Sequence, residues 1–256
     1  MMRSWAVLGA LAGSVLALLL HAPALWLSGL LDAATGARLQ LLEPDGTVWN
    51  GKGRLQVGQA VADGQAVVLP GRIFWSWGWE AGAPVLALRA DCCSPQPQRL
   101  RVLPGWGRLT LQLADGRSQW PAAMLAGLGA PWNTVQAQGE LQLRTQGLSV
   151  EWSASGGRLV GQLQTDALAM ASRLSTLRPV GSYRLTLTAP PGEPPPALLL
   201  QTLEGPLRLQ GSGQWTGQGW RFTGEASADP QSEAALQNLL NMLGRREGSK
   251  ALLSLG

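Results

Sequence analysis

Apolar and polar residues alternate with a period of two through most of this chain. The clearest run is Leu109-Thr110-Leu111-Gln112-Leu113. Shorter runs of the same kind, bounded by Gly, Pro or Asp-Gly, occupy residues 65–69, 72–79, 84–90, 98–103, 140–145, 148–154, 182–188, 197–203 and 207–215. Such alternation predicts half-buried β-strands. Since no strand–helix–strand rhythm interrupts it, we expect a mainly β protein built on an antiparallel sheet that is curved or partly closed.

Two segments depart from this period and predict short helices. Pro121–Leu128 starts with a proline at the first helical position and continues Ala-Ala-Met-Leu-Ala. Gln231–Leu243 spaces its Ala, Leu and Met residues at helical intervals, and Gly244 follows as a plausible C-cap.

The N-terminus is apolar. Arg3 precedes Trp5–Leu20, sixteen residues without a charge, and the apolar character continues to residue 31. One interpretation is a cleaved signal peptide, with Ala22-Pro23-Ala24 at the cleavage site. The other is a retained anchor, since a membrane span needs roughly 20 apolar residues. We expect an N-terminal transmembrane helix within 1–31 that tolerates its proline, and a periplasmic β-rich domain over 32–256.

A β-hairpin is predicted in the sequence LLEPDGTVWNGKG at 41–53. Pro44-Asp45-Gly46 is typical of a turn, because proline presets φ and glycine accepts positive φ. Thr47-Val48-Trp49 has the composition of a strand, and Asn50-Gly51 is a strong signal for a second, hairpin turn. The residues of this signature are Gly46, Thr47, Val48, Trp49 and Gly51.

Composition argues against nucleic acid as a partner. Of 256 residues, 45% are hydrophobic and only 14% are charged, which suits a globular domain with one membrane segment. The formal net charge is +4, and the densest basic cluster is only Arg245-Arg246. A nucleic-acid interface requires a basic patch or stripe, and the sequence contains none.

Candidate chemistry for catalysis is missing from the sequence. The single histidine, His21, lies in the apolar N-terminal segment, which excludes a His-dependent serine hydrolase and a His-containing metal centre in the body of the chain. Carboxylates are dispersed, and neither a phosphate-binding loop nor a dinucleotide fingerprint occurs. We expect a protein that is not an enzyme and holds neither a cofactor nor a metal.

Cys92-Cys93 is the only cysteine pair. Adjacent Cα atoms lie about 3.8 Å apart, below the usual disulfide range of about 4.4–6.8 Å, so a vicinal bridge is strained. In an oxidising periplasm we nevertheless favour the bridge, which would pin the loop at 91–97. A redox role finds no support, since there is no Cys-x-x-Cys and no strongly basic neighbour.

Three tryptophans alternate with small residues, a prominent feature in a chain with twelve Trp, one Tyr and two Phe. Trp75, Trp77 and Trp79 fall on one face if 72–79 is a strand. One interpretation is an aromatic contact face for a lipid chain, a sugar or a partner protein. The simpler one is an aromatic layer in the core of the sheet.

The order of several segments resembles the type II secretion system protein N family. These are the apolar N-terminus, LLEPDGTVWNGKG at 41–53, WPAAMLAGLGAPWNTVQ at 120–136, GSGQWTGQGWRFTGEASA at 211–228 and the C-terminal LQNLLNMLGRREGSKALLSLG. The resemblance implies an inner-membrane-anchored, single-pass component with its bulk in the periplasm. It also implies a role in assembly or stabilisation of the export machine, and contacts with its other subunits and with inner-membrane lipid. The segment GTVWNGKG also resembles AsmA-like periplasmic proteins, which suggests the alternative of a lipid- or amphiphile-binding module.

Overall fold

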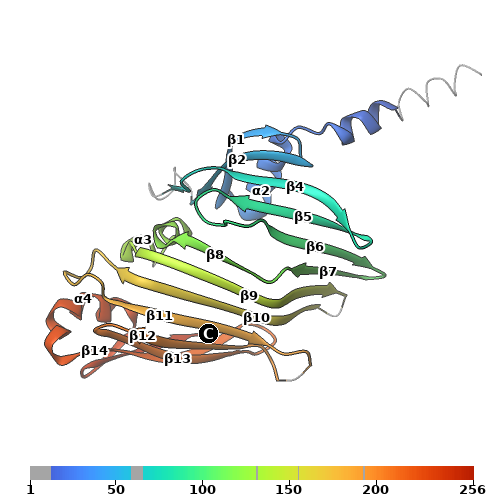
Figure 1. The fold of residues 1–256 in the computed structure, drawn as a ribbon. Coiled ribbons are helices and arrows are strands. Elements are labelled where there is room, and N and C mark those ends of the chain that lie inside the picture. Colours follow the sequence, from blue (N-terminus) through green and yellow to red (C-terminus); the bar gives the residue numbers. More distant parts are fainter. Residues whose placement is uncertain (1–12, 59–65, 131, 155, 193) are drawn as a thin grey trace, which may run out of the picture.

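The computed structural model describes residues 13–58, 66–130, 132–154, 156–192 and 194–256, which form one antiparallel sheet and a few short helices (Figure 1). The strands are β1 Leu39–Gly46, β2 Asn50–Val57, β3 Val67–Val68, β4 Ile73–Glu80, β5 Ala83–Ala90, β6 Gln98–Gly105, β7 Arg108–Leu113, β8 Gly116–Pro121, β9 Gln138–Ser153, β10 Gly156–Ala171, β11 Gly181–Ala189, β12 Ala197–Glu204, β13 Leu207–Trp215, β14 Trp220–Ala228, β15 Arg245–Glu247 and β16 Lys250–Leu255. The helices are α2 Leu25–Thr35, η1 Ala122–Leu128, α3 Trp132–Val135, η2 Pro230–Ser232 and α4 Glu233–Leu243.

The sheet is open. Its strands follow the order β1-β2-β4-β5-β6-β7-β9-β10-β11-β12-β13-β14-β16-β15, with β3 beside β2 and β8 beside β9. Every neighbouring pair is antiparallel. The strands at the two ends, β1 and β15, are not paired with each other in the described part of the chain. The prediction of a mainly β, antiparallel architecture with few helices is confirmed.

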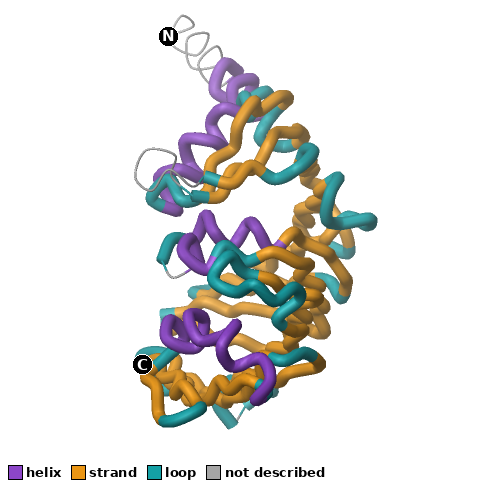
Figure 2. The backbone as a smooth tube through the Cα atoms, turned by 90° about the vertical axis from the view of Figure 1, so that its left-hand side faces the viewer, coloured by secondary structure: helices purple, strands orange, loops and turns teal. Residues whose placement is uncertain are grey.

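The sheet bends around one face, which we call the inner face, and the helices lie on that side (Figure 2). Apolar clusters on this face join α2 to β1 and β4, η1 to β8 and β9, and α4 to β11, β13, β14 and β16. Figure 1 places α3 and α4 near the left-hand ends of the long strands. The helices therefore cover only part of the inner face.

The largest apolar cluster lies beneath α4. Leu236 and Leu240 are fully buried against Tyr183 and Leu207, and the Tyr183 hydroxyl donates a hydrogen bond to the Leu207 carbonyl at 3.1 Å. Burial raises the pKa of Tyr183, which keeps its hydroxyl a neutral donor. The helix predicted over 231–243 is confirmed, with Pro230 opening the short turn η2 in front of it.

The helix predicted over 121–128 is also present, as the 3₁₀ helix η1 with Pro121 immediately before it. Gly127 of η1 lies against the end of β2, where an added Cβ would stand 2.2 Å from the Val57 carbonyl oxygen. Next to it, Gly58 has φ +94, and an added Cβ there would stand 2.9 Å from the Gly127 backbone. Two glycines thus allow η1 to approach the sheet backbone to backbone.

The apolar N-terminal segment is interrupted at its proline. Residues 13–20 are helical and α2 begins at Leu25, while Pro23 between them bridges to Thr47 in the first hairpin loop. The expected single helix through Pro23 is therefore wrong, because proline lacks the N–H that would continue the helical ladder. No helix among the described residues is both long and apolar enough to cross a membrane. Residues 1–12, where the expected anchor starts, lie outside the described residues.

The hairpin at 41–53 exists, but the two predicted turns lie in its strands and the predicted strand forms its loop. β1 runs to Gly46 and β2 begins at Asn50, so Thr47-Val48-Trp49 is the loop and not a strand. The reason is the Thr47 hydroxyl, which accepts hydrogen bonds from the backbone N–H groups of Trp49 and Asn50 at 3.3 and 3.1 Å. Trp49 lies in this loop, at the tip of the hairpin.

A paired carboxylate stabilises the opposite, outer face of the sheet. Both oxygens of Asp166 accept hydrogen bonds from the Arg184 guanidinium, at 2.7 and 2.8 Å. The hydrogen bond from Arg184 lowers the pKa of Asp166, aided by Gln164. Because the pKa is depressed, this carboxylate stabilises the fold above its unfolded pKa of about 3.9 and loses that effect as pH falls towards its folded value.

We expect Asp166→Asn to lower the free energy of unfolding by about 2 kcal/mol at neutral pH, because Arg184 loses its charged acceptor. The difference from the wild type should shrink as the pH drops below about 4. Urea unfolding at pH 7 and pH 3 measures both values. Glu80→Gln, which breaks the exposed pair with Arg99, is the control and should cost under about 1 kcal/mol. A deficit for Asp166→Asn that is the same at both pH values would contradict the assigned pKa shift.

Candidate functional site

The three alternating tryptophans of β4 pass from core to surface along one strand. Trp75 is 5% exposed and packs with Ala24 and Leu41 beneath α2, whereas Trp77 is 38% and Trp79 is 72% exposed. They lie on the inner face, because alternate residues of a strand point to the same side. Core packing therefore describes Trp75 alone. Trp77 and Trp79 lie beyond the described helices, and their side chains are exposed on the inner face.

Rows of cross-strand partners extend this apolar surface over the sheet, since directly opposed residues of antiparallel strands share a face. The rows are Trp77–Leu86–Leu100–Leu113, Leu111–Val150–Leu159 and Leu163–Leu187–Leu198. We call the uncovered part of the inner face the open face. It consists of Trp77, Trp79, Leu100, Leu109, Leu111, Leu113, Val150, Trp152, Leu159, Leu163, Leu185, Leu187 and Leu198. None of these residues belongs to the apolar clusters that the described helices complete.

Charge is segregated from the open face. By the same cross-strand pairing, the charged side chains of strands β4 to β11 project from the outer face. They are Glu80, Arg89, Arg99, Arg101, Arg108, Arg117, Glu140, Arg144, Glu151, Arg158, Asp166 and Arg184. The sheet thus has a charged outer surface and an inner surface that is apolar even where no helix covers it.

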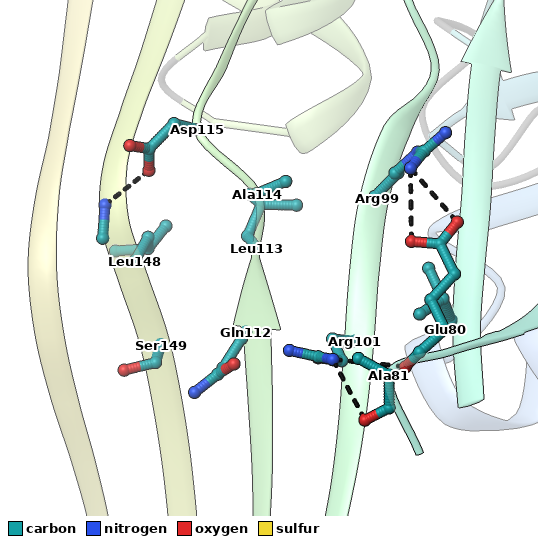
Figure 3. A pocket seen from close by; sticks show the side chains of 12 residues that line it. Glu80, Ala81, Arg99, Arg101, Gln112, Leu113, Ala114, Asp115, Leu148 and Ser149 are labelled. Carbon is teal, nitrogen blue, oxygen red and sulfur yellow. Dashed lines mark hydrogen bonds and ion pairs between the residues drawn. The ribbon is translucent and has the colours of Figure 1, made fainter. Parts of the chain in front are cut away.

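The outer face carries a hollow of about 560 Å³ between β5, β6, β7 and β9, lined by charged and by apolar residues (Figure 3). Its ionisable groups bond to one another and to the backbone. Arg99 pairs with Glu80 at 3.1 Å, and Arg101 donates to the carbonyls of Glu80 and Ala81 at 3.2 and 3.4 Å. Asp115 accepts from the Gly147 N–H at 2.6 Å. These groups are engaged in holding strand ends and loops together, and the arrangement offers no nucleophile beside a base.

Within the described ranges, no three His, Cys, Asp or Glu side chains come together in a group able to hold a metal ion.

The signature residues of the first hairpin bind the sheet together at its β1 end. The Trp75 ring lies over Gly51, where an added Cβ would stand 2.4 Å from a ring carbon. The Trp75 indole N–H donates to the Thr47 carbonyl at 3.0 Å. The Trp49 indole N–H donates to the carbonyl of Leu19 at 2.7 Å, and the Val48 N–H to that of Ala22 at 2.9 Å. These contacts give the predicted signature a structural explanation, with the loop joined to the N-terminal segment.

Cys92 and Cys93 lie in the loop between β5 and β6, with their Sγ atoms bonded and their Cα atoms 3.7 Å apart. Cys93 is buried with Val57, Leu69 and Ala90, whereas Cys92 is exposed. The Cys93 carbonyl accepts a hydrogen bond from the Gln119 N–H of β8 at 2.7 Å. The loop therefore links the β1–β5 part of the sheet to β8, and its oxidation state in the cell stays a prediction.

We expect Cys93→Ser to lower the free energy of unfolding by about 2 kcal/mol more than Cys92→Ser does. Both changes remove the bridge, but only the first buries a hydroxyl in an apolar cluster. Urea unfolding of the two variants tests this, and equal losses would contradict it. For the bridge itself, the intact mass of the wild type should rise by two hydrogen atoms after reduction.

Sequence reasoning found only part of the open face. The tryptophans of β4 stood out by composition, but the leucines of β10, β11 and β12 did not. Their signal was present in the run Ser182–Thr188, where Tyr183, Leu185 and Leu187 alternate with Arg and Thr. The alternation of apolar and polar residues could not predict that α4 covers Tyr183 and does not cover Leu187.

Comparison with known proteins assigns the chain to a family. The model for type II secretion system (T2SS), protein N, matches residues 37–252, which covers nearly all of the sheet and α4. No curated protein and no solved structure matches the chain. The matched region includes every strand that builds the open face. The chain belongs to the type II secretion system protein N family.

Proposed function

We propose that this chain is a non-enzymatic component of the type II secretion machinery that acts in assembly or stabilisation of the apparatus. It is tethered to the inner membrane by residues 1–31, and its β-rich domain, residues 32–256, stands in the periplasm. Membership of the protein N family is the observation that carries the proposal. Two features of the chain agree with it. The ionisable groups of the outer hollow are already paired, and the open face is an uncovered apolar surface of the kind that marks a binding site.

The partners are other subunits of the apparatus and the inner membrane. Site-specific photocrosslinking in cells tests this proposal. A benzophenone amino acid replaces Trp77 on the open face or Gln237 on the exposed side of α4, in separate strains. Thr188, exposed on the outer face of β11, is the control position.

A discrete adduct to another secretion subunit from either position, absent at Thr188, supports the assembly role and locates the contact. The absence of any subunit adduct from both positions, in cells that produce the whole apparatus, would argue against it. Fractionation of the same cells, with and without high-salt or detergent extraction, reports whether the chain is held in the inner membrane as proposed.

A second candidate function is favoured by one observation. The open face is apolar, half-buried to exposed, and lies beyond the described helices, which suits the binding of a lipid or another amphiphile. This function is compatible with a place in the secretion machinery, since a component at the membrane surface meets lipid and protein partners together.

A further inference from the structure

The open face has the chemistry of a hydrocarbon site. Its rows consist mainly of Leu, Val and Trp, with Thr145 opposite Leu163 and Thr165 opposite Leu185, and the charged residues of the same strands lie on the outer face. Protein partners bring polar groups that need hydrogen bonds, about one for every 100–200 Å² of interface. The side chains on this face supply few hydrogen-bonding groups: the tryptophan N–H donors and two threonine hydroxyls, of which that of Thr145 already donates to the Ala114 carbonyl at 3.0 Å. An occupant without hydrogen-bonding groups fits this surface best.

The dimensions of the open face match a lipid chain. From β4 to β12 the order of the sheet includes seven strand spacings, or about 34 Å at about 4.8 Å each. The hydrocarbon core of a bilayer, about 30 Å thick, holds two acyl chains end to end. The open face is therefore long enough to hold acyl chains that lie across the strands. The bend of the sheet around this side makes the surface concave (Figure 2).

One end of the open face adjoins the apolar N-terminal segment. The Trp77 N–H bonds to the Trp49 carbonyl at 2.8 Å, and the Trp49 indole bonds to the Leu19 carbonyl at 2.7 Å. Residues 13–20 are helical, and the side chains of Leu16 and Leu20 are 58% and 59% exposed. An apolar surface thus continues from this segment onto the open face.

We infer that the open face binds the acyl chains of a membrane phospholipid, which enter beside Trp77 and Trp79 and lie across the strands towards Leu198. The inference rests on the proposed location at the inner membrane. It specifies the second candidate function by naming the ligand, the strands that the ligand crosses and the end of the face at which it enters. The tryptophans at the entrance suit the boundary between hydrocarbon and water, where their rings are favoured. One acyl chain, about half as long as the 30 Å core, covers only part of the face, so a phospholipid has to move along the face from Trp79 to reach Leu187 and Leu198.

The test uses the full chain in its native membrane, with a benzophenone amino acid at Leu187, which lies on β11 near the β12 end of the open face. Thr188, the next residue of β11, points to the outer face and is the matched control. After irradiation, the intact mass of the purified chain reveals an added phospholipid. We expect a phospholipid adduct from Leu187 and none from Thr188.

A blocking variant gives a second measurement. Leu163→Glu places a carboxylate in the row beside Leu187 and should reduce the phospholipid adduct from Leu187 by roughly tenfold or more. Gln162→Glu, its neighbour on the outer face, should leave the adduct unchanged. Circular dichroism of each variant checks that the sheet is retained. If Leu163→Glu does not fold, the comparison of Leu187 with Thr188 still decides the question.

Several results would overturn the inference: an adduct from Leu187 to a second copy of this chain or to another protein, no adduct, or phospholipid adducts of equal yield from Leu187 and Thr188. Blots for secretion subunits at Trp77 and Gln237 report the assembly role independently. Subunit adducts without phospholipid at Leu187 leave the secretion role standing and end the lipid inference. A phospholipid adduct at Leu187 without any subunit adduct at Trp77 or Gln237 would support the lipid inference and argue against the assembly role.

Discussion

Leu240→Ala is expected to lower the free energy of unfolding by about 2–5 kcal/mol. Leu240 is fully buried in the cluster that joins α4 to the C-terminal strands. Removal of its side chain costs both the transfer of the deleted atoms and the cavity that remains, because Tyr183, Leu207 and Leu236 cannot all move to fill it. Urea unfolding followed by circular dichroism measures the change.

The matched control is Asn238→Ala on the exposed side of the same helix, which should change the free energy of unfolding by less than about 0.5 kcal/mol. A loss for Leu240→Ala no larger than that of the control would mean that α4 does not hold the C-terminal strands. The variant should also bind more of an apolar dye, since loosening α4 uncovers more of the inner face.

Gly127→Ala is expected to destabilise the protein by about 3 kcal/mol. An added Cβ would stand 2.2 Å from the Val57 carbonyl oxygen and 3.0 Å from the Val57 Cβ. Val57 is buried and its backbone is paired with β1, so the strand cannot give way cheaply. Relief requires η1 to move off the end of β2, which opens the cluster around Cys93 and Met124.

Thermal and urea unfolding of Gly127→Ala measure this loss. Gly78→Ala is the control, because no atom lies within 4 Å of the position of its added Cβ and its φ is not positive. It should leave stability within about 0.5 kcal/mol of the wild type. Equal stability of the two variants would show that η1 can shift at little cost.

Local pattern predicted the strands well, for a physical reason. In Leu109–Leu113 each apolar side chain has an apolar partner across the neighbouring strand, so the period of two survives folding unchanged. The helix at α4 was predicted because its apolar residues change to helical spacing and their buried face is continuous. In both cases the local preference and the tertiary environment agree.

The predictions failed where a contact distant in sequence decides the conformation. The turn signals at Pro44-Asp45-Gly46 are overridden in part because Val48 bonds to Ala22 of the N-terminal segment, and this distant contact adds to the local capping of the loop by Thr47. For the open face, alternation predicted which residues share a side. It could not predict which of them α2, η1 and α4 cover, because that depends on where helices far along the chain pack. Trp75 and Trp77, two residues apart on one strand, therefore have different surroundings.

The junction between the N-terminal segment and the first hairpin also has a mechanical meaning. The Ala24 N–H bonds to Gly46, the Val48 N–H to Ala22 and the Trp49 indole to Leu19, so three hydrogen bonds cross the junction within a few residues. Three bonds spread over several residues restrain the orientation of the segment relative to the sheet more than a single bond would. The N-terminal segment and the sheet should therefore turn together. The orientation in which the N-terminal segment is held then sets the direction in which the concave side of the sheet faces.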